Sequence, residues 1–268
     1  MTDSTDTTDR PVALVTGAAR GIGAASARAL AADGWAVVLA DVCSDIAPLP
    51  YAMATKADLD VSVAACGPHA IGVVADVRHQ DQLDAAVAAG VEAFGGLDAA
   101  VAAAGVVGGG NPGWDITEEA FGVNIDINLT GVWRTAKAAV PAMLQRPKPR
   151  HGRFVAIASA AGMRGNPTIA DYTAAKHGVV GLVRSLALEL AYHGITANAI
   201  APGSTRTDIL QASADLYGLA SVDEFSVHHP IGRNLEPDEI GAGVSWLCAP
   251  ERGGVTGIVL PIDGGMTV

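Results

Sequence analysis

A tyrosine and a lysine one helical turn apart are the residues of this chain whose types and spacing most directly indicate chemistry. Tyr172 and Lys176 stand four positions apart, and Ser159 precedes the tyrosine by thirteen positions. Residues four apart lie on one face of a helix, so the phenol and the ammonium would point into one space. A free tyrosine has a pKa of about 10, and a nearby cation stabilises its phenolate. We therefore expect Tyr172 to exchange a proton with an alcohol oxygen that Ser159 also contacts.

A glycine-rich segment near the start of the chain predicts a dinucleotide site. It directly follows the apolar run Val12–Thr16 and directly precedes an alanine-rich, helix-compatible stretch. In this context the three glycines would make a tight turn, let the backbone approach a pyrophosphate and allow close packing of helix on strand. An ordinary glycine-rich turn is the alternative. The predicted cofactor contacts in this segment are Gly17, Arg20, Gly21, Ile22 and Gly23.

Acidic residues at the ends of the next two apolar runs extend this predicted site. Asp41 follows the second run, where its carboxylate would accept hydrogen bonds from the ribose hydroxyls and repel a 2′-phosphate. This favours NAD over NADP, although Arg20 would argue for NADP. Asp76 and Val77 end the third run, where they would contact adenine. Asp76 is equally suited to cap the following helix.

The two motifs in this order predict an oxidoreductase that interconverts alcohol and ketone with a nicotinamide cofactor. Asn128 lies inside a long helix-compatible segment, where asparagine is a poor helix former. It is either a buried polar residue satisfied by backbone groups or a kink that holds a water carrying protons from Lys176 to solvent.

Composition excludes several other classes of protein. The chain has 28 acidic and 17 basic residues, and its net charge of −11 would repel nucleic acid. Three cysteines without CxxC spacing indicate neither a metal site nor a disulfide framework and favour the cytoplasm. Residues 1–10 resemble a disordered tail, not a signal peptide. No apolar run is long enough to cross a membrane.

Alternation of short apolar runs with helix-compatible stretches predicts an α/β fold with a seven-stranded parallel sheet. Residues 11–268 are expected to form a single Rossmann-like, doubly wound domain, with an insertion at about 42–68 and a substrate lid at about 205–232. The expected strands are Val12–Thr16, Ala36–Ala40, Ile71–Ala75, Ala99–Ala103, Arg153–Ala158, Thr196–Ala201 and Ile258–Pro261. The expected helices are Ile22–Asp33, Gln80–Phe94, Thr117–Leu144, Tyr172–Tyr192 and Pro237–Leu247.

These residues resemble the short-chain dehydrogenase/reductase family from Val12 to Val268. The resemblance implies a catalytic tetrad, cofactor contacts from Thr205 and Thr207 after Pro202-Gly203, and a homotetramer. Members usually carry Asn-Asn-Ala-Gly after the fourth strand, whereas this chain has Ala102-Ala103-Ala104-Gly105. A backbone role near the cofactor is still expected for Ala103 and Gly105. The family's tetrad falls on Asn128, Ser159, Tyr172 and Lys176.

A narrower similarity is to the mycofactocin-coupled branch of that family, which holds NAD tightly and passes its electrons to a peptide-derived carrier. It rests on segments around Ser159, Lys176 and Thr205 and on the ending Asp263-Gly264-Gly265-Met266-Thr267. The insertion follows Asp41 and would fold over the adenine end of the cofactor. Two alternatives stay open, namely a carbonyl reductase with freely exchanging NADH and a non-catalytic NAD-sensing protein.

The substrate is predicted to be a small apolar secondary alcohol or ketone. Trp114, Met163, Arg164 and Asn166 are expected to line its pocket together with the lid around residues 210–225. Trp114 and Met163 are equally suited to packing. His228 and His229 are expected at the surface.

Overall fold

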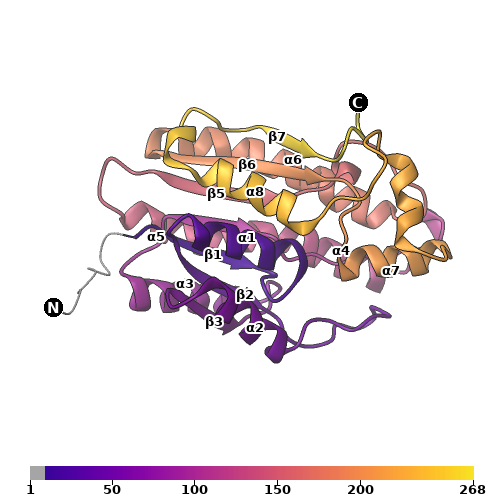
Figure 1. The fold of residues 1–268 in the computed structure, drawn as a ribbon, viewed down its shortest axis with the longest axis horizontal. Coiled ribbons are helices and arrows are strands. Elements are labelled where there is room, and N and C mark those ends of the chain that lie inside the picture. Colours follow the sequence, from indigo (N-terminus) through magenta and orange to yellow (C-terminus); the bar gives the residue numbers. More distant parts are fainter. Residues whose placement is uncertain (1–9) are drawn as a thin grey trace.

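A seven-stranded sheet in which every strand runs parallel to its neighbours forms the centre of the molecule (Figure 1). The computed structural model describes residues 10–268. The strand order is β3-β2-β1-β4-β5-β6-β7. The strands are β1 Val12–Thr16, β2 Ala36–Asp41, β3 Ala70–Val74, β4 Ala99–Ala102, β5 Gly152–Ile157, β6 Ile195–Pro202 and β7 Val259–Ile262.

Helices cover both faces of the sheet, and alternate residues of each central strand pack against opposite layers. In β1, Val12 and Leu14 belong to one apolar cluster, while Ala13 and Val15 belong to another. This follows from the two-residue period of a strand. Strand β1 is fully buried, with helices on both faces of the sheet. This explains why its sequence is a nearly continuous apolar run.

The helical layers divide by face as Figure 1 shows. The first layer contains α1 Gly21–Ala32, α2 Lys56–Cys66 and α8 Pro237–Cys248. The second contains α3 Gln80–Phe94, α5 Gly131–Gln145 and α6 Ala170–Leu190. Two further helices, α4 Glu118–Ile125 and α7 Asp208–Tyr217, lie beyond the carboxyl ends of the strands.

The strand order reverses at β1, which pairs with β2 on one side and β4 on the other. At such a switch point the connections leave toward opposite faces of the sheet and open a crevice beyond the strand ends. The segments after β1, β2, β4 and β5 all reach this crevice. It is the expected location of a bound ligand.

The predicted fold class is confirmed, and all seven strands lie within one residue of their expected bounds. The single helix expected over Thr117–Leu144 is wrong. The chain instead forms α4, a π-helical turn at Asp126–Thr130 and then α5. The π-helical turn places Asn128 where its side chain bonds the backbone of Val106, and inserted turns of this kind are frequent at functional sites.

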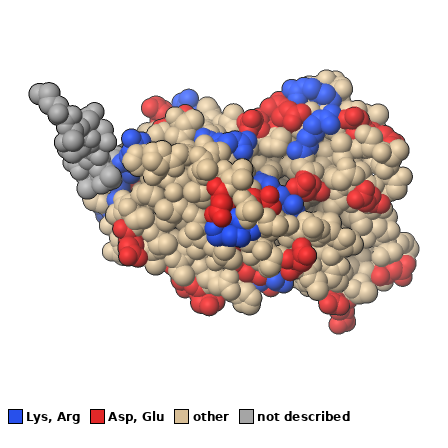
Figure 2. Space-filling view, turned by 60° about the horizontal axis from the view of Figure 1, so that its bottom comes forward, with Lys and Arg blue, Asp and Glu red and all other residues tan. Residues whose placement is uncertain are grey.

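The surface carries charges of both signs in close proximity. Figure 2 shows basic and acidic side chains next to each other on one face of the molecule, separated by uncharged surface. Within residues 10–268 no helix combines the length and apolarity needed to span a membrane. The prediction of a disordered tail at residues 1–10 falls almost wholly outside the described residues.

Candidate active site

A cavity of about 770 Å³ lies at the carboxyl ends of the strands. Its walls include the glycine-rich loop, the ends of β2 to β5, the segment that follows β2, the start of α6, the turn that carries Asn128, and the lid. We call residues 42–55 the strap and residues 205–232 the lid. The strap and the lid are far apart in sequence, yet both contribute walls to this cavity.

The glycine-rich loop needs its glycines at positions 17 and 23 on steric grounds. Gly17 has φ +64°, and a Cβ there would lie 2.6 Å from the Cα of Ala104. A Cβ on Gly23 would lie 2.0 Å from the carbonyl oxygen of Gly17. The side chain of Arg20 does not cap α1, so the first backbone N–H groups of this helix stay available to an anion. Gly21 and Ile22 also line the cavity.

The carboxylate of Asp41 lies at the cavity wall, where it is 8% exposed. Oδ2 accepts a hydrogen bond from the N–H of Ala19 at 3.0 Å, and Oδ1 accepts one from Cys43 at 3.3 Å. These bonds fix the carboxylate and still leave it acceptor capacity for ribose hydroxyls. Its position is therefore the one that the sequence predicted.

Asp76 lines the same cavity beside Val77 but does not cap a helix. The cap position of α3 is occupied by His79, whereas Asp76 forms an ion pair with Arg78 at 2.6 Å. Burial raises the pKa of Asp76, but hydrogen bonds from Arg78 outweigh burial and hold this pKa below its ordinary value. The cap interpretation is thus wrong, and contact with adenine stays a prediction.

The loop after β4 keeps its link to β1 despite its alanines. The hydroxyl oxygen of Thr16 accepts hydrogen bonds from the N–H groups of Ala103 and Ala104, at 3.2 and 3.3 Å. Gly105 lies beside the catalytic candidates, because a Cβ there would be 3.0 Å from Asn128 Oδ1 and 3.7 Å from Lys176 Nζ. Ala103 and Gly105 both line the cavity, as expected.

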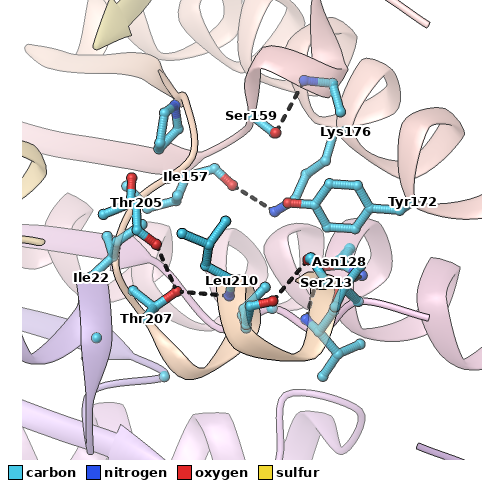
Figure 3. A pocket seen from close by; sticks show the side chains of 18 of the residues that line it. Ile22, Asn128, Ile157, Ser159, Tyr172, Lys176, Thr205, Thr207, Leu210 and Ser213 are labelled. Carbon is cyan, nitrogen blue, oxygen red and sulfur yellow. Dashed lines mark hydrogen bonds between the residues drawn. The ribbon is translucent and has the colours of Figure 1, made fainter. Parts of the chain in front are cut away.

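Helix α6 carries Tyr172 and Lys176 on one face, and Figure 3 shows their polar ends turned toward each other. Lys176 Nζ lies 5.5 Å from the centre of the Tyr172 ring. The same ammonium donates a hydrogen bond to the carbonyl oxygen of Ile157 at 2.8 Å. Ser159 follows β5, and its hydroxyl accepts a hydrogen bond from Ala161 at 3.1 Å. The predicted trio therefore meets at one point of the cavity.

Burial has the largest effect on the pKa values of Tyr172 and Lys176. Desolvation lowers the pKa of Lys176 to about 8. Desolvation also raises the pKa of Tyr172, although a hydrogen bond with Ser159 lowers it. The expected stabilisation of the phenolate by the neighbouring lysine does not outweigh burial, because removing water from the phenolate has the larger effect on the pKa of Tyr172. The positive charge of an oxidised nicotinamide would lower the pKa of Tyr172.

Asn128 is fully buried in the π-helical turn. Its Nδ2 donates to the carbonyl of Val106 at 3.0 Å and to Asn124 Oδ1 at 3.1 Å, and its Oδ1 accepts from the N–H of Val106 at 3.1 Å. These bonds fit the interpretation of a polar residue satisfied by its surroundings. A π-helical turn interrupts the α-helix here, while a kink that holds a water relay stays a prediction.

The start of the lid brings Thr205 and Thr207 to the cofactor side of the cavity. Thr205 is buried, and Thr207 caps α7 by accepting a hydrogen bond from the N–H of Leu210 at 3.3 Å. The Thr207 methyl group lies 3.2 Å from where a Cβ on Gly21 would be. The lid thus packs directly on the glycine-rich loop.

Arg20 connects the glycine-rich loop to both the strap and the lid. Its Nη2 donates to the carbonyl of Ala52 at 2.7 Å, and its Nε lies 3.0 Å from Asp208 Oδ2. The guanidinium therefore spans two walls of the cavity. The sequence indicated only that Arg20 belongs to the pyrophosphate loop.

Two of the residues expected at the substrate do not line the cavity. Trp114 is 87% exposed in a short 3₁₀ helix, and Met163 is 42% exposed. Arg164 and Asn166 do line it. Sequence spacing identified the loop after β5 but not the direction of each side chain in it.

The structure corrects the surface expectation for His229 but not for His228, which is exposed, and adds residues that the sequence did not single out. His229 is buried, and its Nε2 accepts a hydrogen bond from Ser204 at 3.0 Å, while His228 lines the cavity. Tyr51 and Tyr217 line the cavity as well. In the sequence, the one feature that could have indicated Tyr51 is the presence of an aromatic residue inside a proline-containing insertion.

The chain belongs to the short-chain dehydrogenase/reductase family. Residues 17–267 match the family model described as "Enoyl-(Acyl carrier protein) reductase". (-)-trans-Carveol dehydrogenase of Rhodococcus erythropolis is 38% identical over 272 residues, covering 96% of this chain and 97% of that protein.

Solved structures agree with this assignment. Carveol dehydrogenase from Mycobacterium avium in complex with NAD has a TM-score of 0.90 and 34% identity, covering 97% of this chain and 98% of that one. A short-chain dehydrogenase from Mycobacterium paratuberculosis bound to NAD has a TM-score of 0.86 and 35% identity, covering 96% and 97%. The chain is an NAD-dependent oxidoreductase of this family.

Asp41 should determine the preference for NAD. We expect Asp41→Asn to lower the ratio of bound NAD to bound NADP about tenfold or more, because hydrogen bonds to a charged group contribute about 1.5–3 kcal/mol. The asparagine keeps an oxygen for the N–H of Ala19. The ratio of NAD to NADP bound after loading from an equimolar mixture measures the effect. An unchanged ratio would contradict this role.

Proposed function

We propose that the protein interconverts a secondary alcohol and a ketone, with Tyr172 as general acid and base. The observation that carries this proposal is the meeting of Tyr172, Ser159 and Lys176 in a cavity that also contains the glycine-rich loop. Bound NAD would supply the hydride acceptor for alcohol oxidation.

Each residue of the trio has a distinct role in the proposal. The Ser159 hydroxyl orients the substrate oxygen toward the phenol. Tyr172 takes the alcohol proton during oxidation and returns it to the ketone oxygen during reduction. The Lys176 ammonium, held by Ile157, keeps positive charge beside the phenolate. Asn128 would position a water through which Lys176 exchanges protons with solvent.

A small apolar substrate agrees with the lining of the cavity. Ile169, Ile209 and Leu210 come from α6, α7 and their connections, and all three line the cavity. The relative from Rhodococcus erythropolis is named for carveol, an alcohol. We propose a secondary alcohol of this general kind as substrate for this chain.

The strap supports the proposal that NAD stays bound between turnovers and passes its electrons to mycofactocin. Ile46, Met53 and Ala54 line the cavity, and Ile46 and Ala54 are buried. Arg20 holds the strap at Ala52 and the lid at Asp208. A cofactor under both segments would leave only after one of them moved, so its electrons would go to a separate acceptor.

Tyr172→Phe tests the proposed chemistry and distinguishes it from an NAD-sensing function. We expect oxidation of secondary alcohols to fall by at least 10²-fold, the lower range for loss of a general base, while bound NAD is retained. Stopped-flow measurement of NADH formation in NAD-loaded protein gives the rate. Tyr192→Phe is the control, because this tyrosine is 98% exposed. Equal rates in wild type and Tyr172→Phe would refute the proposed base.

Cofactor retention distinguishes the proposal from a carbonyl reductase with freely exchanging NADH. We expect the purified protein to keep NAD through gel filtration and Arg20→Gln to lose it faster, because the variant gives up the ion pair to Asp208. Arg28→Gln is the matched control, since Arg28 pairs with Asp238 outside the main cavity. Nucleotide released on denaturation measures retention. Wild-type protein that emerges empty would favour the reductase.

We further propose a homotetramer in the cytoplasm. Trp133, Leu188 and Tyr192 are exposed on α5, α6 and the turn after α6, and Trp246 is exposed on α8. We propose that α5 and α6 form one dimer contact and that α8 with β7 forms the other. Free thiols among the described residues agree with a reducing compartment.

Light scattering tests the proposed tetramer and should give four times the mass of the chain. A monomer at micromolar concentration would contradict the assembly.

A further inference from the structure

The strap brings an aromatic side chain from the cofactor end of the fold into the catalytic region. Tyr51 lines the cavity, and its hydroxyl oxygen accepts a hydrogen bond from the N–H of Val107 at 2.9 Å. Its ring packs with an apolar cluster built on Val107, Ile169 and Ala212, and Tyr172 packs against the same cluster. One side chain of the strap therefore shares its surroundings with the proposed catalytic base.

Neighbouring bonds hold Tyr51 in this position. The next residue, Ala52, accepts the hydrogen bond from Arg20 at 2.7 Å. The N–H of Met53 donates to Asp45 Oδ1 at 2.9 Å and closes the strap on itself. Because the backbone is bonded on one side of Tyr51 and its hydroxyl is bonded to Val107, the ring has little freedom to leave the cavity wall.

The hydroxyl group of Tyr51 has unused donor capacity. It accepts from Val107, and its own hydrogen reaches no protein acceptor within residues 10–268. Burial, followed by the nearby Tyr172, raises its pKa to about 12, so it stays protonated at neutral pH. Tyr217 differs, because its hydroxyl already donates to the carbonyl of Pro167 at 2.9 Å. Of these two cavity tyrosines, Tyr51 is the one with a hydrogen to offer.

We infer that Tyr51 is a specificity-determining residue that donates a hydrogen bond to a second oxygen of the substrate. The inference rests on the proposed function and narrows it. The preferred substrate carries one secondary alcohol at Tyr172 and another hydroxyl or carbonyl oxygen on a distant carbon. An apolar cavity makes such a bond selective, because an oxygen without a partner there is costly.

Two cyclic alcohols that differ in one hydroxyl group test this role. Cyclohexanol and cyclohexane-1,4-diol have the same ring, and only the diol has a second oxygen. NAD-loaded wild type, Tyr51→Phe and Tyr217→Phe are each mixed with both alcohols. The slope of the single-turnover rate of NADH formation against alcohol concentration gives kcat/KM for the steps up to hydride transfer. The readout is the ratio of kcat/KM for diol to that for cyclohexanol.

We expect wild type to favour the diol and Tyr51→Phe to lower the ratio about tenfold, the order expected for one buried hydrogen bond. Tyr217→Phe should keep the wild-type ratio. A ratio unchanged in Tyr51→Phe, or lowered equally in Tyr217→Phe, would overturn the inference while leaving the proposed function in place. Failure of wild type to oxidise either alcohol would overturn both.

Discussion

A buried ammonium group constrains the whole site. Lys176 is 3% exposed, and an isolated charge is costly to remove from water. Its hydrogen bond to Ile157 at the end of β5 and its position over the Tyr172 ring are the compensation that the fold supplies. Both require α6 to lie against the ends of the central strands. Burial lowers the pKa of Lys176 to about 8. A charge brought near the ammonium would therefore change its protonation close to neutral pH.

Close approach of backbone to backbone is the second constraint. The turn after β1 touches the loop after β4, and Thr16 bonds the two, so a side chain at Gly17 would push them apart. A side chain at Gly23 would push the start of α1 away from the same turn. The same compactness at Gly105 keeps Asn128 and Lys176 near each other. The dinucleotide site and the proton-handling site are therefore parts of one packed arrangement.

The strap and the lid are connected at the cavity by specific side-chain contacts. Arg20 bonds both segments, so the strap and the lid are joined to the glycine-rich loop through one side chain. The strap also contributes Tyr51 to the wall beside Tyr172. A segment whose position suggests a role only at the adenine end thus also forms the cavity wall near Tyr172.

The sequence by itself determined the features that depend on local periodicity and composition. These include the parallel sheet, the glycine turn and the shared face of Tyr172 and Lys176, because strand and helix geometry relate near neighbours in a fixed way. Tertiary structure alone decided contacts between distant segments, such as Tyr51 with Val107 and Arg20 with Asp208. It also turned Trp114 to solvent and buried His229. Loop side chains follow no period, so their directions are set only when the surrounding elements pack.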